Sequence, residues 1–343
     1  MFLACKDNEN YSYTIILFII FATEMKLQRL FTFLIAVFIV SATTAGRPKI
    51  GLVLGGGGAK GAAEVGVLKV IEQAGIPIDY VAGSSVGAIV GGLYAAGYSA
   101  NELETMFQTQ EWLSLLTDRN AAFSNELIKT QDGVTYVFGF PVMDKNSKGF
   151  GMMRGGRIEK VLDSMVSVRG CTEFESLRIP FRCVAADIRT AKEVILSKGV
   201  LATAIRASMA IPGIFKPVNK GDYMLVDGGL LNNLPVDVCK AMGADIIIAI
   251  DLQQEEKQPR KQTDTSALSG LVDFLGLGGV IEWLANRPDI RKHVENKKLA
   301  DIYIRPNIPD YDITSFGNKN SARMIKAGEE AAKQHWEELI KLK

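Results

Sequence analysis

The pentapeptide Gly83-Ser84-Ser85-Val86-Gly87 places a serine between two glycines, a spacing found in nucleophilic hydrolases. An apolar strand pattern, residues 79–82, precedes it, and an apolar helix pattern, residues 85–96, follows it. In this strand–turn–helix setting the serine lies on a sharp turn that exposes its hydroxyl. We therefore predict that Ser85 is a nucleophile. We expect Gly83 and Gly87, which have no side chain, to leave room for neighbouring elements of the fold to approach. The alternative is a turn of small residues that only packs a helix on a sheet.

Asp227 is the predicted proton acceptor for Ser85. It opens Asp227-Gly228-Gly229 directly after a predicted strand, residues 224–226. A carboxylate there could reach Ser85 if the two strands lie side by side. Because the usual pKa of aspartate is about 4, this base must act through its position and its shielding from water. The alternative is an aspartate that caps a turn, a common use of Asp-Gly.

The chain contains two histidines, which limits a histidine-based triad. Ser85, Asp227 and His293 do follow the chain order of an α/β-hydrolase triad. However, His293 lies in a charged stretch, residues 291–298, where we expect it to be solvated, and His335 falls in an amphipathic helix pattern. The sequence therefore favours a Ser85–Asp227 dyad, with the triad through His293 as the alternative.

A glycine run, residues 55–58, stands between a predicted strand and a predicted helix. Acyl transfer passes through a tetrahedral oxyanion, which needs N–H donors, and a helix N-terminus adds positive potential. We predict that the amides of Gly56, Gly57 and Gly58 form this oxyanion hole. Lys60 either adds positive potential or holds the loop in place, and the second role is favoured because a lysine on a first helical turn is usually solvated.

The same run contains the G-x-G-x-x-G pattern of dinucleotide-binding loops, completed by Gly61. That function needs an acidic residue at the end of the second strand, where this chain has Gly83-Ser84-Ser85. A phosphate-binding P-loop needs Gly-Lys-Ser/Thr, but glycine follows Lys60. Both nucleotide interpretations are therefore disfavoured.

Strand and helix patterns alternate along the chain, which predicts an α/β fold with a mostly parallel sheet and right-handed crossovers. Ser99 and Glu102 form a predicted capping box at the start of a third helix. We expect strands at residues 49–54, 79–82, 136–141, 181–188, 193–197, 224–226, 244–250 and 300–305. We expect the other helices at residues 59–74, 85–96, 157–166, 201–208, 235–242 and 321–342.

The N-terminal region resembles a secretory signal. From Met25 onward it has a basic start, an apolar middle and a small-residue end, with cleavage expected after Ala45. We hypothesise that Met25 is the true start; an uncleaved membrane anchor is the alternative. The predicted organisation is a signal or membrane segment at 1–45, a hydrolase domain at 46–310 and a helical extension at 311–343. The protein is expected to be exported to the periplasm or secreted, with membrane association as an option.

Composition narrows the choice of partners. Lys+Arg 39 against Asp+Glu 38 gives a net charge of +1, without the basic excess of a nucleic-acid-binding protein. After cleavage Cys171, Cys183 and Cys239 would remain, with no CxxC pair, and Cys183 is predicted to be a buried thiol. For residues 267–285 a packed helix is favoured over an interfacial, acyl-contacting element.

The three glycine motifs resemble, in the same order, those of the patatin-like phospholipase family. The similarity runs from about residue 49 to residue 251 and includes a fourth segment, residues 206–217. The chain differs from many members of that family at two positions, where it has Lys60 in place of Arg and Ser84 in place of Thr. The matching motifs are Gly56-Gly57-Gly58-Ala59-Lys60-Gly61, Gly83-Ser84-Ser85-Val86-Gly87 and Asp227-Gly228-Gly229.

The resemblance implies a three-layer α/β/α fold, a Ser85–Asp227 dyad and a glycine-rich oxyanion hole. It also implies esterase activity on phospholipids, lysophospholipids or other acyl lipids, without a required metal. We expect no cofactor, and we expect the protein to act at a membrane surface. A homodimer is left open. The rival hypothesis is a non-catalytic module that binds a lipid headgroup or a nucleotide through the glycine loop. It is disfavoured because a binding module has no use for a nucleophile elbow plus an aspartate at a strand end.

Overall fold

The computed structural model describes residues 47–116, 136–137, 140–141, 153–212, 214–253 and 290–343. The chain divides into two compact units, Met1–Pro48 and Lys49–Lys343, and all of the described strands and helices belong to the second. The predicted signal segment at 1–45 and the predicted helix at 267–285 lie outside the described residues. None of the helices in the described ranges is both long and apolar enough to span a bilayer.

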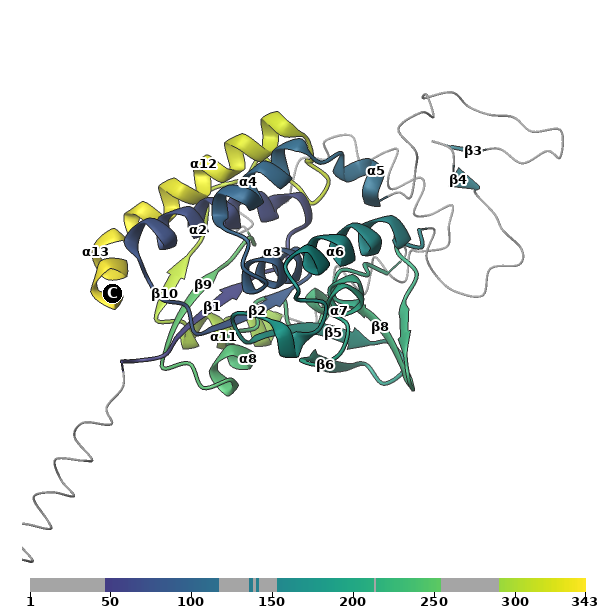
Figure 1. Ribbon diagram of the computed structural model, residues 1–343, viewed down its shortest axis with the longest axis horizontal. Coiled ribbons are helices and arrows are strands. Elements are labelled where there is room, and N and C mark those ends of the chain that lie inside the picture. The colour runs from purple at the N-terminus through teal and green to yellow at the C-terminus, as the bar shows by residue number, and fades with distance from the viewer. Residues whose placement is uncertain (1–46, 117–135, 138–139, 142–152, 213, 254–289) are drawn as a thin grey trace, which may run out of the picture. The chain divides into compact units, whose positions relative to one another are not determined.

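An eight-stranded sheet forms the middle layer of this unit (Figure 1). Five neighbouring strands are parallel, and three further strands are antiparallel to the neighbours with which they pair. The parallel strands, in spatial order, are β10 (Ile302–Ile304), β9 (Ile246–Ile250), β1 (Ile50–Leu54), β2 (Tyr80–Ser84) and β5 (Phe181–Asp187). The antiparallel strands are β6 (Lys192–Leu196), β7 (Val218–Lys220) and β8 (Tyr223–Asp227).

The register on β5 determines how the two candidate catalytic motifs meet. Its first residues pair with β2, up to Ser84 opposite Val184, and its last residues pair with β8, from Asp227 opposite Ala185. β6 pairs with both halves of β5, so it occupies the other edge. β2 and β8 therefore lie along the same edge of β5, one after the other, and the C-terminal end of β2 faces the C-terminal end of β8. The condition that the two strands lie side by side is not met, because they meet end to end.

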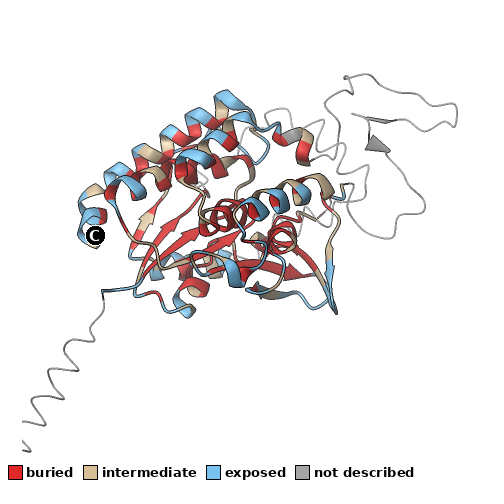
Figure 2. Cartoon of the chain, viewed as in Figure 1, coloured by how far each residue is buried: buried red, intermediate tan, exposed pale blue. Residues whose placement is uncertain are grey.

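Helices cover both faces of the sheet, which confirms the three-layer α/β/α prediction. The side chains of β1 alternate, with Leu52 and Leu54 in a large core on one face and Val53 in a smaller core on the other. Buried residues concentrate in the strands and on the inner sides of the helices (Figure 2). The large core is built with α2 (Ala62–Ala74), α3 (Val86–Ala95), α4 (Ala100–Thr109), α6 (Gly156–Val168), α7 (Leu201–Ser208) and α12 (Asn318–Gln334). The smaller core contains α8 (Val236–Ala241), beside which α11 (Ile290–Leu299) packs.

The C-terminal helix α12 packs at very close range on α2. A Cβ added at Gly66 would lie 1.9 Å from the carbonyl oxygen of Ile325, and one at Gly328 would lie 1.9 Å from that of Ala63. The two backbones approach each other through these glycines. The predicted extension at 311–343 thus contributes a helix to the same core, and its boundary at residue 310 stays a prediction.

Two local expectations differ from the structure, and some elements were not indicated by the sequence. Residues 136–141 were expected to form one strand, but β3 (Tyr136–Val137) and β4 (Phe140–Pro141) pair antiparallel. The expected helix at 321–342 ends at Gln334, after which α13 (Trp336–Leu339) and a 3-10 turn (Ile340–Leu342) bury Leu339. The sequence patterns did not indicate β7, α11 or the short helix α5 (Trp112–Leu116).

Candidate active site

Ser85 occupies a strained turn between β2 and α3. Its φ of 53° and ψ of −121° lie outside the regions that non-glycine residues prefer, and such a conformation persists only where its surroundings enforce it. The two flanking glycines explain how. A Cβ at Gly83 would lie 2.3 Å from the carbonyl oxygen of Gly87, and one at Gly87 would lie 2.3 Å from that of Leu54. The pentapeptide therefore packs tightly against β1 and forms the predicted sharp turn.

The hydroxyl of Ser208 fills the gap where β2 and β8 meet. It lies at the C-terminal end of α7, donates to the carbonyl oxygen of Val184 at 2.6 Å and accepts from the backbone N–H of Ser85 at 3.1 Å. These two hydrogen bonds fix the backbone of Ser85 to β5. Residues 206–217 belong to the segment that resembles the patatin-like family, but nothing in the sequence alone distinguished Ser208 from any other helical serine.

Asp227 lies directly against the hydroxyl of Ser85. Ser85 Oγ donates to Asp227 Oδ2 at 2.6 Å, while the amide of Gly229 donates to Asp227 Oδ1 at 2.7 Å. The backbone N–H of Asp227 donates to the carbonyl oxygen of Ala210 at 2.9 Å. Ser85 and Asp227 are both buried. The structure thus brings together the two residues that the sequence named, from positions 142 residues apart.

Burial changes the acid–base properties of this carboxyl. Desolvation raises the pKa of Asp227 from 3.8 to about 6, against the smaller lowering effects of the hydrogen bonds from Ser85 and Gly229. A carboxylate of this pKa accepts a proton more readily than one in water, and it is still ionised at neutral pH. The local environment thus strengthens the base that the sequence had marked as weak.

The glycine loop lies beside Ser85. A Cβ at Gly56 would be 3.1 Å from the Cβ of Ser85. The N–H of Gly56 donates to the carbonyl oxygen of Asn233 at 3.0 Å, so this amide is already used. Within the described part of the chain, the amides of Gly57 and Gly58 have no acceptor. Of the three predicted oxyanion donors, these two are the ones still able to bind an anion.

The remaining motif residues hold the loops against each other. Lys60 Nζ donates to the carbonyl oxygen of Leu252 at 2.9 Å, which ties the glycine loop to the chain just after β9. Gly61 packs against Val86 at the start of α3, where an added Cβ would lie 2.2 Å from its side chain. Gly228 and Gly229 begin a 3-10 turn (Gly228–Leu230) that Asp227 caps.

Both histidines lie in the described ranges, and neither contacts the Ser85–Asp227 pair. His293 was expected to be solvated, but its side chain is only 14% exposed and its Nε2 lies 3.0 Å from Asp251 Oδ2. Asp251 also accepts a hydrogen bond from the hydroxyl of Tyr303 at 2.6 Å. The solvation prediction is wrong because α11 packs next to the end of β9. His335 lies near Glu338, at 3.4 Å.

Beyond the Ser85–Asp227 pair, the cysteines and groups of side chains able to bind a metal ion are further candidates for chemistry. Cys171, Cys183 and Cys239 are buried free thiols, which confirms the prediction for Cys183, and burial raises the pKa of its thiol. In the described ranges no three His, Cys, Asp or Glu side chains converge closely enough to hold a metal ion.

Curated relatives resemble this chain in sequence. The chain is 33% identical over 217 residues to an uncharacterized NTE family protein of Mycobacterium tuberculosis, covering 63% of this chain and 52% of that protein. It is 31% identical over 284 residues to the lysophospholipase nte1 of Emericella nidulans, covering 78% of this chain and 17% of that protein. The chain thus spans about half or less of the length of these relatives.

A solved structure shares the fold. VipD of Legionella pneumophila superposes with a TM-score of 0.53 at 15% sequence identity, over 86% of this chain and 67% of that chain. A family model described as patatin-like phospholipase matches residues 52–240, a range that includes the glycine loop, Ser85 and Asp227. That match covers more than half of the 343 residues. The chain therefore belongs to the patatin-like phospholipase family.

Proposed function

We propose that this protein is a serine lipid acyl hydrolase in which Ser85 is the nucleophile and Asp227 the general base. The observation on which the proposal rests is the 2.6 Å hydrogen bond from Ser85 Oγ to Asp227 Oδ2 at a strained turn. The hydroxyl and the carboxylate are in direct contact. The proposed reaction therefore runs through a dyad, and the aspartate performs the proton transfers that a histidine performs in a triad.

In the first half-reaction Ser85 Oγ attacks the carbonyl carbon of the ester while its proton moves to Asp227 Oδ2. The carbonyl oxygen becomes an oxyanion, for which the amides of Gly57 and Gly58 are the proposed donors. When the intermediate collapses, the bond to the leaving alcohol breaks and that oxygen takes the proton from Asp227. An acyl group then remains on Ser85.

In the second half-reaction water attacks the acyl-enzyme carbonyl carbon. Asp227 takes a proton from that water and returns it to Ser85 Oγ as the acyl–oxygen bond breaks, which releases a fatty acid. The raised pKa of Asp227 suits both directions of transfer, because an acid–base group works best near the operating pH. Phospholipids and lysophospholipids are the substrates we propose, in line with family membership.

Labelling with a fluorophosphonate tests the nucleophile. We expect the reagent to label the wild type and to leave Ser85→Ala unlabelled. Ser85→Ala should also lose hydrolysis of a p-nitrophenyl acyl ester. Ser164→Ala, an exposed serine on α6, is the matched control and should behave as wild type. Absence of wild-type labelling would instead support the non-catalytic binding module.

His293→Ala separates the dyad from a triad. Since His293 pairs with Asp251 rather than with Asp227, we expect kcat/KM to stay within about threefold of wild type. Stability should fall by about 1–3 kcal/mol, because buried Asp251 loses a partner. A loss of activity comparable to that of Ser85→Ala would favour the triad.

A further inference from the structure

Asn233 connects the glycine loop to the segment that follows Asp227. The backbone N–H of Gly56 donates to the carbonyl oxygen of Asn233 at 3.0 Å, and Asn233 Nδ2 donates back to the carbonyl oxygen of Gly56 at 3.1 Å. Both backbone polar groups of Gly56 are therefore bonded to one residue, which lies 177 positions away in the chain. Gly56 is the residue directly before the two proposed oxyanion donors.

The side chain of Asn233 is also packed between the two loops. A Cβ at Gly56 would lie 2.2 Å from Asn233 Oδ1, and a Cβ at Gly229 would lie 2.4 Å from the same atom. Glycine is required at both positions for the amide to fit between them. The amide thus contacts the glycine loop on one side and the turn that follows Asp227 on the other.

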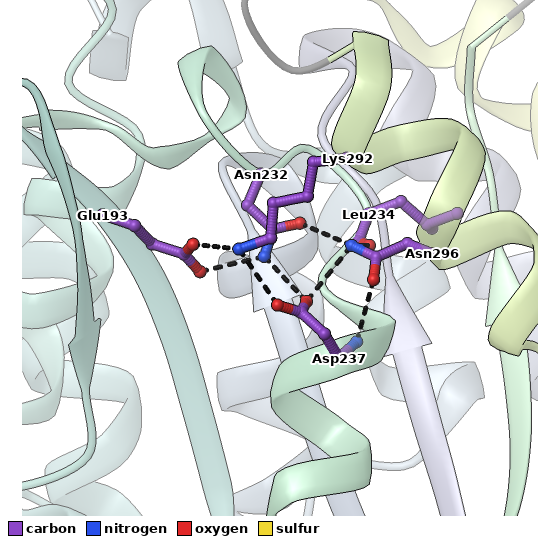
Figure 3. Close-up of polar contacts among 6 residues, drawn as sticks. All are labelled: Glu193, Asn232, Leu234, Asp237, Lys292 and Asn296. Atoms are coloured by element: carbon purple, nitrogen blue, oxygen red, sulfur yellow. Dashed lines mark hydrogen bonds and ion pairs between the residues drawn. The ribbon is translucent and has the colours of Figure 1, made fainter.

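A polar network from α11 anchors the residues on either side of Asn233 (Figure 3). Asn296 Nδ2 donates to Asn232 Oδ1 at 2.9 Å and to the carbonyl oxygen of Leu234 at 2.8 Å. Asn296 is buried, so these bonds are shielded from water. The backbone immediately before and after Asn233 is therefore held from behind by one side chain.

Charged groups complete this network. Asp237 Oδ1, at the start of α8, accepts from Asn232 Nδ2 at 2.9 Å, and Lys292 Nζ lies 2.9 Å from Asp237 Oδ2. Glu193 on β6 pairs with Lys292 and accepts from Asn232 Nδ2 as well. Figure 3 shows these side chains converging from β6, α8 and α11 on the loop. Hydrogen-bonded networks of this kind rigidify a loop when each member has a partner.

We propose that Asn233 is a positioning residue that sets the placement of the oxyanion donors relative to Ser85 and Asp227. The proposal rests on the proposed hydrolase function. Oxyanion stabilisation depends on donors held close to where the charge develops, and a displacement of about 1 Å can cost a hundredfold in rate. Asn233 acts through Gly56 and does not itself contact the substrate.

The kinetic test compares Asn233→Ala with Asn233→Leu, which keeps the branched shape but cannot hydrogen-bond. We expect both variants to lose about tenfold to a hundredfold in kcat with KM within about threefold of wild type. They should bind a lipid trifluoromethyl ketone, whose carbonyl becomes an oxyanion when Ser85 adds to it, more weakly by a similar factor. Affinity for the matching alcohol, which forms no oxyanion, should be unchanged.

Asn219→Ala, an exposed asparagine on β7, is the matched control and should show wild-type kinetics. Wild-type kcat in both Asn233 variants would overturn the proposal. Restoration of kcat by leucine would also overturn it, because packing alone would then suffice. Equal weakening of the ketone and the alcohol would do so too, since a structural role affects both ligands alike.

Amide hydrogen exchange provides a measurement that needs no activity. In Asn233→Ala we expect faster exchange across residues 55–61, with the melting temperature within a few degrees of wild type. Asn296→Ala should speed exchange at residues 230–235 and, to a smaller extent, at 55–61. Unchanged exchange at 55–61 in Asn233→Ala would contradict the proposal. If the wild type proved inactive while this exchange increased, the hydrolase function would fail and the positioning of the loop by Asn233 would stand.

Discussion

At the scale of single residues, the burial of Asp227 affects both the role proposed for its carboxylate and the stability of the fold. Its carboxyl is buried, and it accepts hydrogen bonds only from Ser85 and the amide of Gly229 within the described residues. These bonds do not fully replace the water that burial removes, so the pKa rises to about 6. The same desolvation that makes the Asp227 carboxylate more basic therefore disfavours its charged form in the folded state.

The pH dependence of kcat/KM follows from this shift. Ser85 can give its proton only to ionised Asp227, so kcat/KM should increase about tenfold per pH unit below pH 6 and level off above about pH 7. A pH–rate profile from pH 4.5 to 8.5 with a soluble acyl ester measures it. A profile that is flat across pH 5–7, or that falls as pH rises through 6, would contradict the assignment of Asp227 as the base.

Stability should show the opposite trend at this position. The pKa of Asp227 in the folded state exceeds its unfolded value of 3.8. The free energy of unfolding that this shift adds is therefore fully present below about pH 4, where the carboxyl is neutral, and is lost as pH rises through 6. At pH 8 the cost is on the order of 3 kcal/mol. Asp227→Asn should therefore be inactive yet more stable than wild type at pH 8, by up to about that amount.

Urea unfolding at pH 8 and at pH 4.5 measures this difference. The advantage of Asp227→Asn should shrink at the lower pH, where the wild-type carboxyl is itself neutral. A variant that is less stable than wild type at pH 8 would show that the two hydrogen bonds of the carboxylate outweigh its desolvation.

At the scale of elements, the contact between α2 and α12 depends on glycines that helix propensity alone would disfavour. Glycine in a helix costs about 1 kcal/mol relative to alanine. Gly66 and Gly328 are retained in mid-helix positions where the facing backbone leaves no space for a Cβ. The packing of α12 thus explains a feature of α2 that its own sequence does not.

Gly66→Ala should therefore destabilise the protein by about 1–3 kcal/mol or more, because a methyl group would meet the carbonyl oxygen of Ile325. Gly156→Ala at the start of α6 is the matched control. No atom lies within 4 Å of the Cβ that it would add, so it should be neutral or up to about 1 kcal/mol more stable. Chemical denaturation compares them, and equal stability of the two variants would refute the close packing.

At the scale of the whole molecule, the compact unit Lys49–Lys343 begins close to the cleavage point that the sequence suggests. A leader removed after Ala45 would leave every strand of the described sheet intact, since β1 starts at Ile50. Export is therefore compatible with the fold, and it stays a prediction.

N-terminal sequencing of the protein recovered from an exporting bacterial host tests this prediction. We expect a mature chain that begins near Gly46, whether translation starts at Met1 or at Met25. A version that starts at Gly46 with a new initiator methionine is the control and should stay in the cytoplasm. Recovery of an intact N-terminus from the full chain would favour the uncleaved anchor.

Much of the fold followed from local patterns. The predicted helix at 201–208 matches α7, and the capping box of Ser99 and Glu102 begins α4 as expected. Such features depend on residues a few positions apart, which the sequence displays directly. The short strand β7 and the antiparallel direction of β8 were not predicted, because neither depends on a local pattern.

The sequence by itself named the two candidate reacting groups, since a serine in a strand–turn–helix setting and an aspartate at a strand end are readable from residue type and spacing. Only the tertiary structure decided how they meet. Strand order and direction place β2 and β8 end to end on β5, and the hydroxyl of Ser208 fits the resulting gap. The tertiary structure also pairs His293 with Asp251 rather than with Asp227, and it joins Gly56 to Asn233 by hydrogen bonds. These contacts join positions far apart in the chain, and packing of the whole sheet and its helices determines which of them form.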